Sequence, residues 1–413
     1  MLKLNFDVKR HFLDNGLEVV TVKKDTQIAA VNVGISVGSL YENMNEKGIA
    51  HFIEHMLFKG TKKRSYEDIN DGLELLGGEY NAYTDYAATV YTISCLTEEI
   101  KNGVEILSDM IINSSFRKEE VEKERGVILA EIRTSKDDVE DLSFKRINEE
   151  AFEKSPLRYD VAGLEENVKK YSKKDLETFY NKYYVPNNAV ITIVSSFDHE
   201  EAFETISKWF SNWKKGEDIK REIIEEKNIE KVIVTEKENI EQSTIVYLYT
   251  FYDLDREYEL PLRILNHRLG ESANSLLFRE VRENKGLAYD IYTNLDMTKN
   301  VKTLYIYTAV GEDDIDGALE AINSTLEGVK SGKIEIGDRD LTLMKKVHKT
   351  AVISTLEDPS ELCNYILHQS LEGEDIHEFV KDMERLNNLD TSKIYEVSKK
   401  VLKNPTIHIL KSS

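Results

Sequence analysis

The sequence predicts an α+β fold made of two similar domains, each a mainly antiparallel sheet packed with helices. Short runs rich in valine, isoleucine and threonine are separated by turns and amphipathic helices, so hairpins are mixed with helical connections. The same succession recurs in the second half of the 413-residue chain. Each repeat spans about 200 residues, which is too long for a solenoid repeat and suits a domain.

Local patterns place the elements of the first half. Apolar or alternating runs rich in β-branched residues indicate strands, and apolar residues spaced by three or four indicate helices. Ser65 is the expected N-cap of one helix, and Gly77 with Gly78 is its stop. The expected strands are 17–22, 29–37, two within 80–96, and 189–195; the expected helices are one around 48–58, 65–76, 98–113, further helices as far as 153, 173–182 and 200–213.

The second half repeats this order. A helix, an Asn/Pro turn and a strand close each repeat, at 180–194 and again at 397–410. The charged, aromatic-poor stretch 215–230 is the expected linker between an N-terminal domain, 1–214, and a homologous C-terminal domain, 231–413. The expected strands are 231–234, 242–250, 287–291, 303–309 and 406–410; the expected helices are 258–269, 276–284, 314–331 and 397–402.

Composition limits the function. The net charge of −21 disfavours nucleic acid or an anionic membrane as a partner and suits basic or extended peptides. The two cysteines, Cys95 and Cys363, cannot form a disulfide framework, which fits a reducing cytoplasm. The N-terminal residues 1–16 have no apolar signal core, and no run of about 18 apolar residues predicts a membrane span.

The most informative stretch is His51-Phe52-Ile53-Glu54-His55. On a helix, His51 and His55 lie one turn apart on one face, and Glu54 lies on the same side. The neighbouring residues are apolar, so the helix is expected to be buried. Burying two imidazoles and a carboxylate is costly without a partner, and a metal ion satisfies all three. The competing interpretation is a pair of structural core histidines.

A third ligand is needed because catalytic zinc is usually held by three protein side chains. Glu131 is the candidate: it lies in the apolar end of a predicted helix, flanked by Ile128, Leu129 and Ile132. Glu124, two turns earlier, shares its face. The remaining glutamates of this segment are expected to be solvated.

The chain resembles the pitrilysin/insulinase family of zinc peptidases, the inverzincins, and most of all its processing-peptidase branch. The resemblance rests on His51-x-x-Glu54-His55 followed by a glutamate 76 residues after the second histidine. It extends to Leu57-Phe58-Lys59-Gly60-Thr61, to the segment 77–84 and to the segment 275–289. It covers essentially the whole chain and implies the two-domain fold expected above.

The resemblance implies a role for each site residue. His51, His55 and Glu131 would bind one Zn²⁺ per chain, with water in the fourth position and Glu54 as the general base. Glu124 would support a ligand histidine as an outer-sphere residue. The strand Asn81-Ala82-Tyr83-Thr84 would bind substrate as an added β-strand, although by itself it fits an ordinary strand after a Gly-Gly turn. Arg282 and Tyr289 would bind substrate and stabilise the oxyanion.

The expected function is therefore zinc-dependent endopeptidase activity on peptides or unfolded presequence-like segments, enclosed in a dimer chamber. A homodimer is expected because the zinc motif and the Arg282/Tyr289 pair occur on one chain, in separate repeats. The alternative is a non-catalytic scaffold or partner subunit of the same fold. The intact set His51, Glu54, His55 and Glu131 favours the enzyme.

Overall fold

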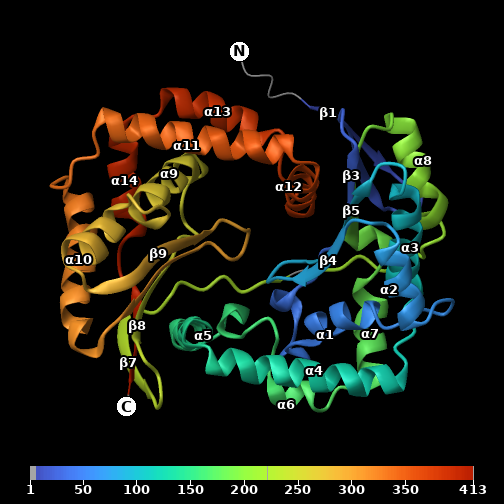
Figure 1. The fold of residues 1–413 in the computed structure, drawn as a ribbon, viewed down its shortest axis with the longest axis horizontal. Coiled ribbons are helices and arrows are strands. Elements are labelled where there is room, and N and C mark those ends of the chain that lie inside the picture. The colour runs from blue at the N-terminus through green and yellow to red at the C-terminus, as the bar shows by residue number, and fades with distance from the viewer. Residues whose placement is uncertain (1–5, 221, 413) are drawn as a thin grey trace. The chain divides into compact units, whose positions relative to one another are not determined.

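The computed structural model describes residues 6–220 and 222–412. The chain forms two compact units, each a sheet covered by helices (Figure 1). Neither unit is continuous in sequence. Unit 1 comprises Met1–Ile132, Tyr159–Glu222 and Val352–Val380; unit 2 comprises Arg133–Arg158, Ile223–Ala351 and Lys381–Ser413.

The sheet of unit 1 has six strands in the order β1-β2-β6-β3-β5-β4. All neighbouring pairs are antiparallel except β2 with β6. The strands are β1 (Asp7–Phe12), β2 (Glu18–Lys23), β3 (Ile28–Ile35), β4 (Glu79–Thr84), β5 (Thr89–Leu96) and β6 (Ala189–Ser195).

The sheet of unit 2 has five strands in the order β7-β11-β8-β10-β9. Only β7 and β11 are parallel. The strands are β7 (Lys231–Lys237), β8 (Ser243–Thr250), β9 (Ala288–Asp296), β10 (Thr303–Val310) and β11 (Thr406–Ser412).

The two sheets share one topology. Strands β7, β8, β9, β10 and β11 take the places of β2, β3, β4, β5 and β6, in the same chain order and with the same single parallel pair. This match confirms the duplication and the α+β class with two mainly antiparallel sheets. Strand β1 has no counterpart among the described strands of unit 2.

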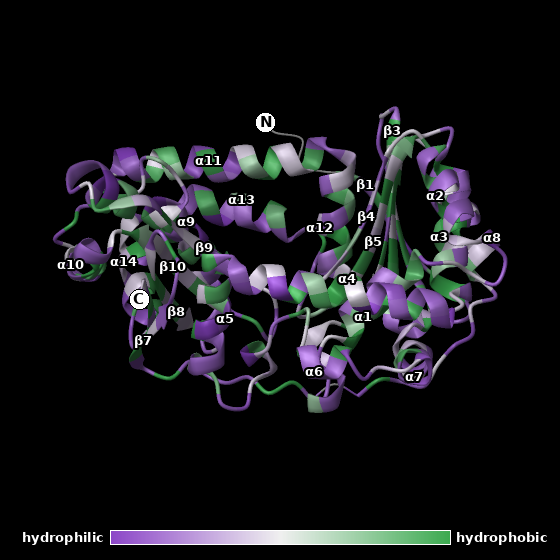
Figure 2. Cartoon of the chain, turned by 60° about the horizontal axis from the view of Figure 1, so that its bottom comes forward, coloured by the Kyte–Doolittle hydropathy of each residue, from purple (hydrophilic) through white to green (hydrophobic). Residues whose placement is uncertain are grey.

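Helices cover both faces of the first sheet. The buried strand residues and the apolar helix faces form a core layer on each face of the sheet, while the outer helix faces carry the polar residues (Figure 2). The helices of the first repeat are α1 (Ile49–Leu57), α2 (Tyr66–Glu74), α3 (Ile100–Asn113), α4 (Lys118–Asp137), α5 (Val139–Ala151), α6 (Glu165–Val168), α7 (Lys173–Tyr183) and α8 (His199–Phe210), with short 3₁₀ turns η1 (Ser39–Tyr41), η2 (Met44–Glu46), η3 (Pro156–Arg158) and η4 (Pro186–Asn188).

The second repeat also contributes helices. They are α9 (Glu259–Gly270), the π-helical segment η6 (Phe278–Asn284), α10 (Ile315–Ser331), α11 (Asp338–Glu357), α12 (Pro359–Glu372), α13 (Glu378–Asn388) and α14 (Thr391–Val401), with 3₁₀ turns η5 (Arg256–Tyr258) and η7 (Glu312–Asp314). Among the helices of the described residues, none has the length and apolar character needed to cross a membrane.

The repeats exchange one helix. Helix α12 of the second repeat packs on β3 and β6 of unit 1, where Cys363, Ile366 and Leu367 join a second core layer. Helix α5 of the first repeat packs on the equivalent strands β8 and β11 of unit 2. The continuous domains 1–214 and 231–413 therefore differ from the compact units, although the segment 215–230 does lie between the two sheets in chain order; residue 221 is outside the described residues.

Most expected elements form within a few residues of their predicted bounds. Ser65 caps α2 by accepting a hydrogen bond from Asp68 N, and Gly77 adopts φ +63° just after that helix. Strand β1, whose sequence DVKRHF is polar, was not predicted, and neither were the short helix α6 and the helices α11, α12 and α13. The expected absence of a signal core at residues 1–16 falls partly on residues 1–5, outside the described residues.

Candidate metal centre

Helix α1 carries the site, and a buried glutamate fixes its first turn. The first N–H groups of a helix have no partner inside it. Glu42 supplies one: its carboxylate accepts hydrogen bonds from the backbone N–H of Gly48 and of Ala50, both at 2.9 Å. Burial raises the pKa of Glu42 to about 8, against the two N–H groups, which lower it.

Gly48 allows the chain to turn from the preceding loop into α1. Its φ of +93° is a left-handed conformation that residues with a Cβ adopt at a cost. A Cβ there would also lie 2.5 Å from the carbonyl oxygen of Ala162 and 2.9 Å from the Cα of Gly163. The chain therefore needs glycine where the loop turns into α1 and packs closely against 162–163.

Apolar residues of α1 are buried in the core of unit 1, which leaves one face for polar side chains. Ile49, Phe52, Ile53 and Met56 are fully buried. His51 and His55 lie on the remaining face, and their rings contact edge to face with centroids 4.7 Å apart. The sequence interpretation of one shared face is confirmed.

The carboxylate of Glu131 approaches both histidines. Its two oxygens lie 3.8 Å from His51 Nε2 and 3.7 Å from His55 Nε2. One ligand atom from each residue lies within 4.8 Å of the others. Helix α4, which carries Glu131, runs beside α1 (Figure 1). Ile128, Leu129 and Ile132 of α4 belong to the same core as α1, and this packing holds Glu131 in place.

This donor set fits zinc. Zinc binds imidazole nitrogen at about 2.0–2.1 Å and carboxylate oxygen at about 2.0–2.2 Å, so tetrahedral ligand atoms lie about 3.4 Å from each other. The observed separations of 3.7 and 3.8 Å are slightly wider than this spacing. Two histidines and one glutamate leave a fourth coordination position open, as in catalytic rather than structural zinc sites.

Glu124 sets the orientation of His55. Its Oε2 lies 3.1 Å from His55 Nδ1, and its Oε1 forms an ion pair with Lys59 Nζ at 2.9 Å. An acceptor at Nδ1 keeps the proton there and leaves Nε2 free to bind a metal. Glu124 therefore contacts the His55 ring nitrogen that does not face Glu131.

The two histidines titrate differently. Burial lowers the pKa of His51 to about 4, so this imidazole is neutral, the form that binds metals. For His55, burial also lowers the pKa, but the hydrogen bond with Glu124 and the charges of Glu54, Glu131 and Glu124 outweigh it, so its pKa is raised. An excess of negative charge around His55 favours a cation at this position.

Glu54 lies beside this cluster on the same helix. Thr84 Oγ1 donates a hydrogen bond to Glu54 Oε2 at 2.7 Å. Burial raises the pKa of Glu54, opposed by the bond from Thr84 and by the charge of His55. A raised carboxyl pKa matches the requirement for proton transfer near neutral pH.

Strand β4, which carries the expected substrate residues Asn81, Ala82, Tyr83 and Thr84, is an edge of the first sheet. It pairs only with β5 among the described strands. Two side chains at one end of β4 hold it in place. Thr84 donates its hydrogen bond to Glu54. The Tyr83 hydroxyl donates to Asn364 Oδ1 at 2.8 Å and lies 2.7 Å from His368 Nε2, and both of these residues are on α12. The open edge next to α1 is thus held by the exchanged helix α12.

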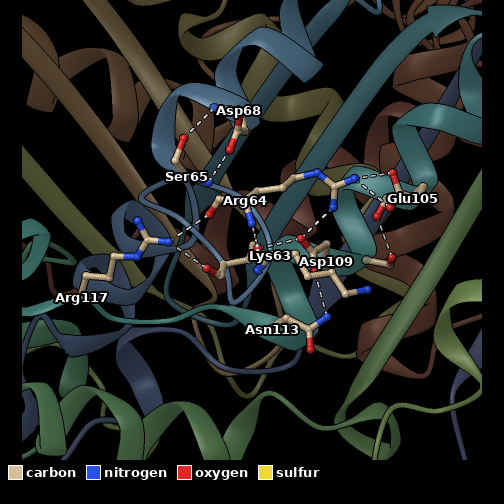
Figure 3. Close-up of polar contacts among 10 residues, drawn as sticks. Lys63, Arg64, Ser65, Asp68, Glu105, Asp109, Asn113 and Arg117 are labelled. Carbon is tan, nitrogen blue, oxygen red and sulfur yellow. Dashed lines mark hydrogen bonds and ion pairs between the residues drawn. The ribbon is translucent and has the colours of Figure 1, made fainter.

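A polar network holds the loop that follows α1. Arg64 forms ion pairs with Glu105 at 2.6 Å and with Asp109 at 2.7 Å, both on α3 (Figure 3). Thr61 also donates to Asp109, at 2.7 Å. Because Lys59 belongs to this loop, the network also fixes the cation that pairs with Glu124.

Comparisons with known proteins identify the family of this chain. The family model described as Insulinase (Peptidase family M16) matches residues 18–164, and the one described as Peptidase M16 inactive domain matches residues 170–344. An uncharacterized zinc protease of Rickettsia bellii is 33% identical over 342 residues, which cover 81% of each chain. The chain belongs to the insulinase family of peptidases, M16.

Two further comparisons add a related sequence and a related fold. The mitochondrial-processing peptidase subunit beta of Dictyostelium discoideum is 34% identical over 227 residues, 54% of this chain and 48% of that one. A protease from Helicobacter pylori has the same fold, with a TM-score of 0.92 over 98% of this chain and 100% of that one at 23% identity. The similarity to processing peptidases inferred from the motifs is confirmed.

The other residue pair that the M16 resemblance singled out lies in unit 2. The Arg282 guanidinium stacks over the rings of Phe278, at 4.6 Å, and of Tyr289, at 5.1 Å. Tyr289 is largely exposed at the start of β9. The structure thus brings Arg282 and Tyr289 together on the surface of unit 2.

Sequence reasoning assigned no role to two residues at this M16 site. Lys59 belongs to the motif extension 57–61, and its position one turn after His55 was the available signal. Asp160, whose charge raises the pKa of His51 against burial, lies in a loop with no such signal. Thr84 was expected to contact substrate, and its bond to Glu54 was not foreseen.

Proposed function

We propose that this chain is a zinc metalloendopeptidase that cleaves peptides or unfolded, presequence-like segments. The observation that carries the proposal is the convergence of His51, His55 and Glu131 with Glu54 beside them on α1. Relatives named zinc protease, and one named a mitochondrial-processing peptidase subunit, support the reaction and the substrate class.

His51 Nε2, His55 Nε2 and a carboxylate oxygen of Glu131 would hold the ion. Bound zinc acts as a Lewis acid and lowers the pKa of water toward ~7. Glu54 takes up the proton of the attacking water and passes it to the leaving amine. Thr84 holds one oxygen of Glu54, which leaves the other for the proton.

The substrate would pair with the open edge of β4 as an additional strand. Main-chain hydrogen bonds then provide affinity with little sequence preference, which suits unfolded segments. Thr84 belongs both to this strand and to the hydrogen bond with Glu54, so a peptide on β4 lies next to the proposed base.

Arg282 and Tyr289 would bind the substrate and stabilise the oxyanion. Their proximity on unit 2 supports a joint role. We further propose that the enzyme is a homodimer in which each chain supplies this pair to its partner's metal centre.

Cleavage of an internally quenched peptide by the purified, zinc-loaded chain tests the proposal. The Glu54→Gln variant should bind zinc normally and lose about 100- to 10,000-fold in turnover. Glu166→Gln, which changes an exposed glutamate of α6 in the same unit, is the matched control and should retain full activity.

The outcome separates the enzyme from the alternative. A wild-type chain that binds stoichiometric zinc yet cleaves no peptide in a broad library would favour the non-catalytic scaffold. Near-normal turnover by Glu54→Gln would contradict the assignment of Glu54 as the base.

A further inference from the structure

Strand β7 forms an open edge of the second sheet. It pairs with β11 on one side, and the sheet order places no described strand on its other side. An exposed edge offers unpaired backbone N–H and C=O groups to an added strand. Folded proteins usually protect such an edge with charges, a bulge or a covering segment.

The edge is also apolar. Cross-strand partners share a face, and the row Tyr247–Ile407–Val232 runs from the centre of the sheet to its edge with exposures of 0%, 9% and 64%. The next row, Ile245–Ile409–Val234, gives 0%, 4% and 52%. The buried apolar layer thus continues onto β7 and ends in solvent.

The duplicated fold shows how such an edge is covered. Strand β2 is the counterpart of β7, and in unit 1 the antiparallel strand β1 pairs with it along its whole length. The four central residues of β2, Val19, Val20, Thr21 and Val22, are buried. The covering strand carries Lys9, Arg10 and His11, and Arg10 forms an ion pair with Glu18 of β2 at 3.1 Å.

The residues on and around β7 carry an excess of negative charge, which favours a basic partner strand. Glu230, Glu236, Glu238 and Glu241 have no ion pair among the described residues. The nearby cations are engaged: Lys231 pairs with Glu150 at 2.7 Å. Lys237 donates to the backbone carbonyls of 136 and 137, and Lys227 pairs with Asp253.

We propose that the β7 edge is a docking site for an extended, basic segment of a partner polypeptide, which adds to the sheet antiparallel to β7. Apolar side chains at two alternate positions of the segment cover Val232 and Val234, and a basic side chain at the next position on the same face meets Glu236. The site is separate from the metal-binding residues and does not depend on the proposed peptidase activity.

The probe is a fluorescent heptapeptide that carries valine opposite Val232 and Val234, lysine opposite Glu236 and threonine at its other positions. Its binding is followed by anisotropy. The Glu54→Gln chain serves as the parent protein so that the peptide stays intact. A Val232→Ser/Val234→Ser variant removes the apolar contact at two exposed positions, and Glu236→Lys reverses one charge. Leu75→Ser, at an exposed leucine directly after α2 in unit 1, is the matched control.

The probe should bind the parent and Leu75→Ser chains equally, and the double serine variant and Glu236→Lys each at least tenfold more weakly. An acidic peptide, the same sequence with glutamate in place of lysine, should bind at least tenfold more weakly than the probe, and added salt should reduce this difference. Circular dichroism verifies that the variants are folded; should the double variant unfold, Glu236→Lys with the acidic peptide completes the test.

Three results would overturn the proposal. One is absence of binding, and another is equal binding by the edge variants and the parent. The third is a dimer, seen by sedimentation velocity, that dissociates in the serine variant, because a second copy of this chain would then cover β7.

Discussion

The carboxylate of Glu124 lies 3.1 Å from His55 Nδ1, and its other oxygen pairs with Lys59 at 2.9 Å. This contact decides which nitrogen of His55 faces Glu131. It also places a negative charge behind the ligand, which increases the basicity of Nε2. Several consequences of the site geometry can be measured.

Replacing Glu124 with glutamine should weaken zinc binding about 10- to 100-fold without removing a direct ligand. The amide keeps the size but loses the charge that His55 and Lys59 contact. Competition with a fluorescent chelator measures the affinity. Glu119→Gln, at an exposed position of the same helix, is the control and should bind zinc as the wild type does. Unchanged affinity in Glu124→Gln would show that the contact is only structural.

Glu131→Gln should lower both zinc content and activity, because the third proposed ligand loses its negative charge. Metal content after dialysis, determined by atomic emission, measures this effect. Stoichiometric zinc with unchanged resistance to chelators would exclude Glu131 as a ligand. Glu124 would then be the next candidate, although its carboxylate faces Nδ1 of His55 rather than Nε2.

Gly48→Ala should destabilise the start of α1 by more than the cost of a left-handed alanine, which is about 1–2 kcal/mol. The added Cβ would meet the Ala162 carbonyl oxygen at 2.5 Å. Gly77→Ala is a matched control, because Gly77 has φ +63° but open space where its Cβ would be. Chemical denaturation gives both free energies of unfolding. Equal losses would mean that the loop 162–163 moves away without cost.

The proposed homodimer predicts complementation between two inactive chains. Glu54→Gln lacks the base, and Arg282→Ala lacks one member of the pair proposed to act in trans. Random assortment makes about half of the dimers mixed, each with one complete site of two, so about a quarter of wild-type activity should return. Peptide cleavage after confirmed subunit exchange provides the measurement. Failure to recover activity would place Arg282 in the same chain's site or outside the chemistry.

The sequence by itself determined what depends on local geometry. The spacing of His51 and His55 places them on one helix face whatever surrounds the helix, because the α-helical period is fixed by the backbone. The duplication was readable for the same reason: each repeat carries its own strand and turn signals in the same order. The apolar neighbours of Glu131 predicted a buried side chain, and this was wrong, because the side chain is 48% exposed; the family pattern assigned its role.

Tertiary structure alone decided the contacts between distant segments. Nothing local to Tyr83 indicates that its hydroxyl meets Asn364 and His368, about 280 residues later, because α12 reaches the first sheet only through the exchange with α5. The residues of the polar strand β1 have weak strand propensity, so β1 forms because it pairs with β2. The open edge of β7 appears only when the two sheets are compared strand by strand. The burial of a side chain and the pairing of a strand depend on which distant segments pack together, and local sequence patterns do not specify that packing.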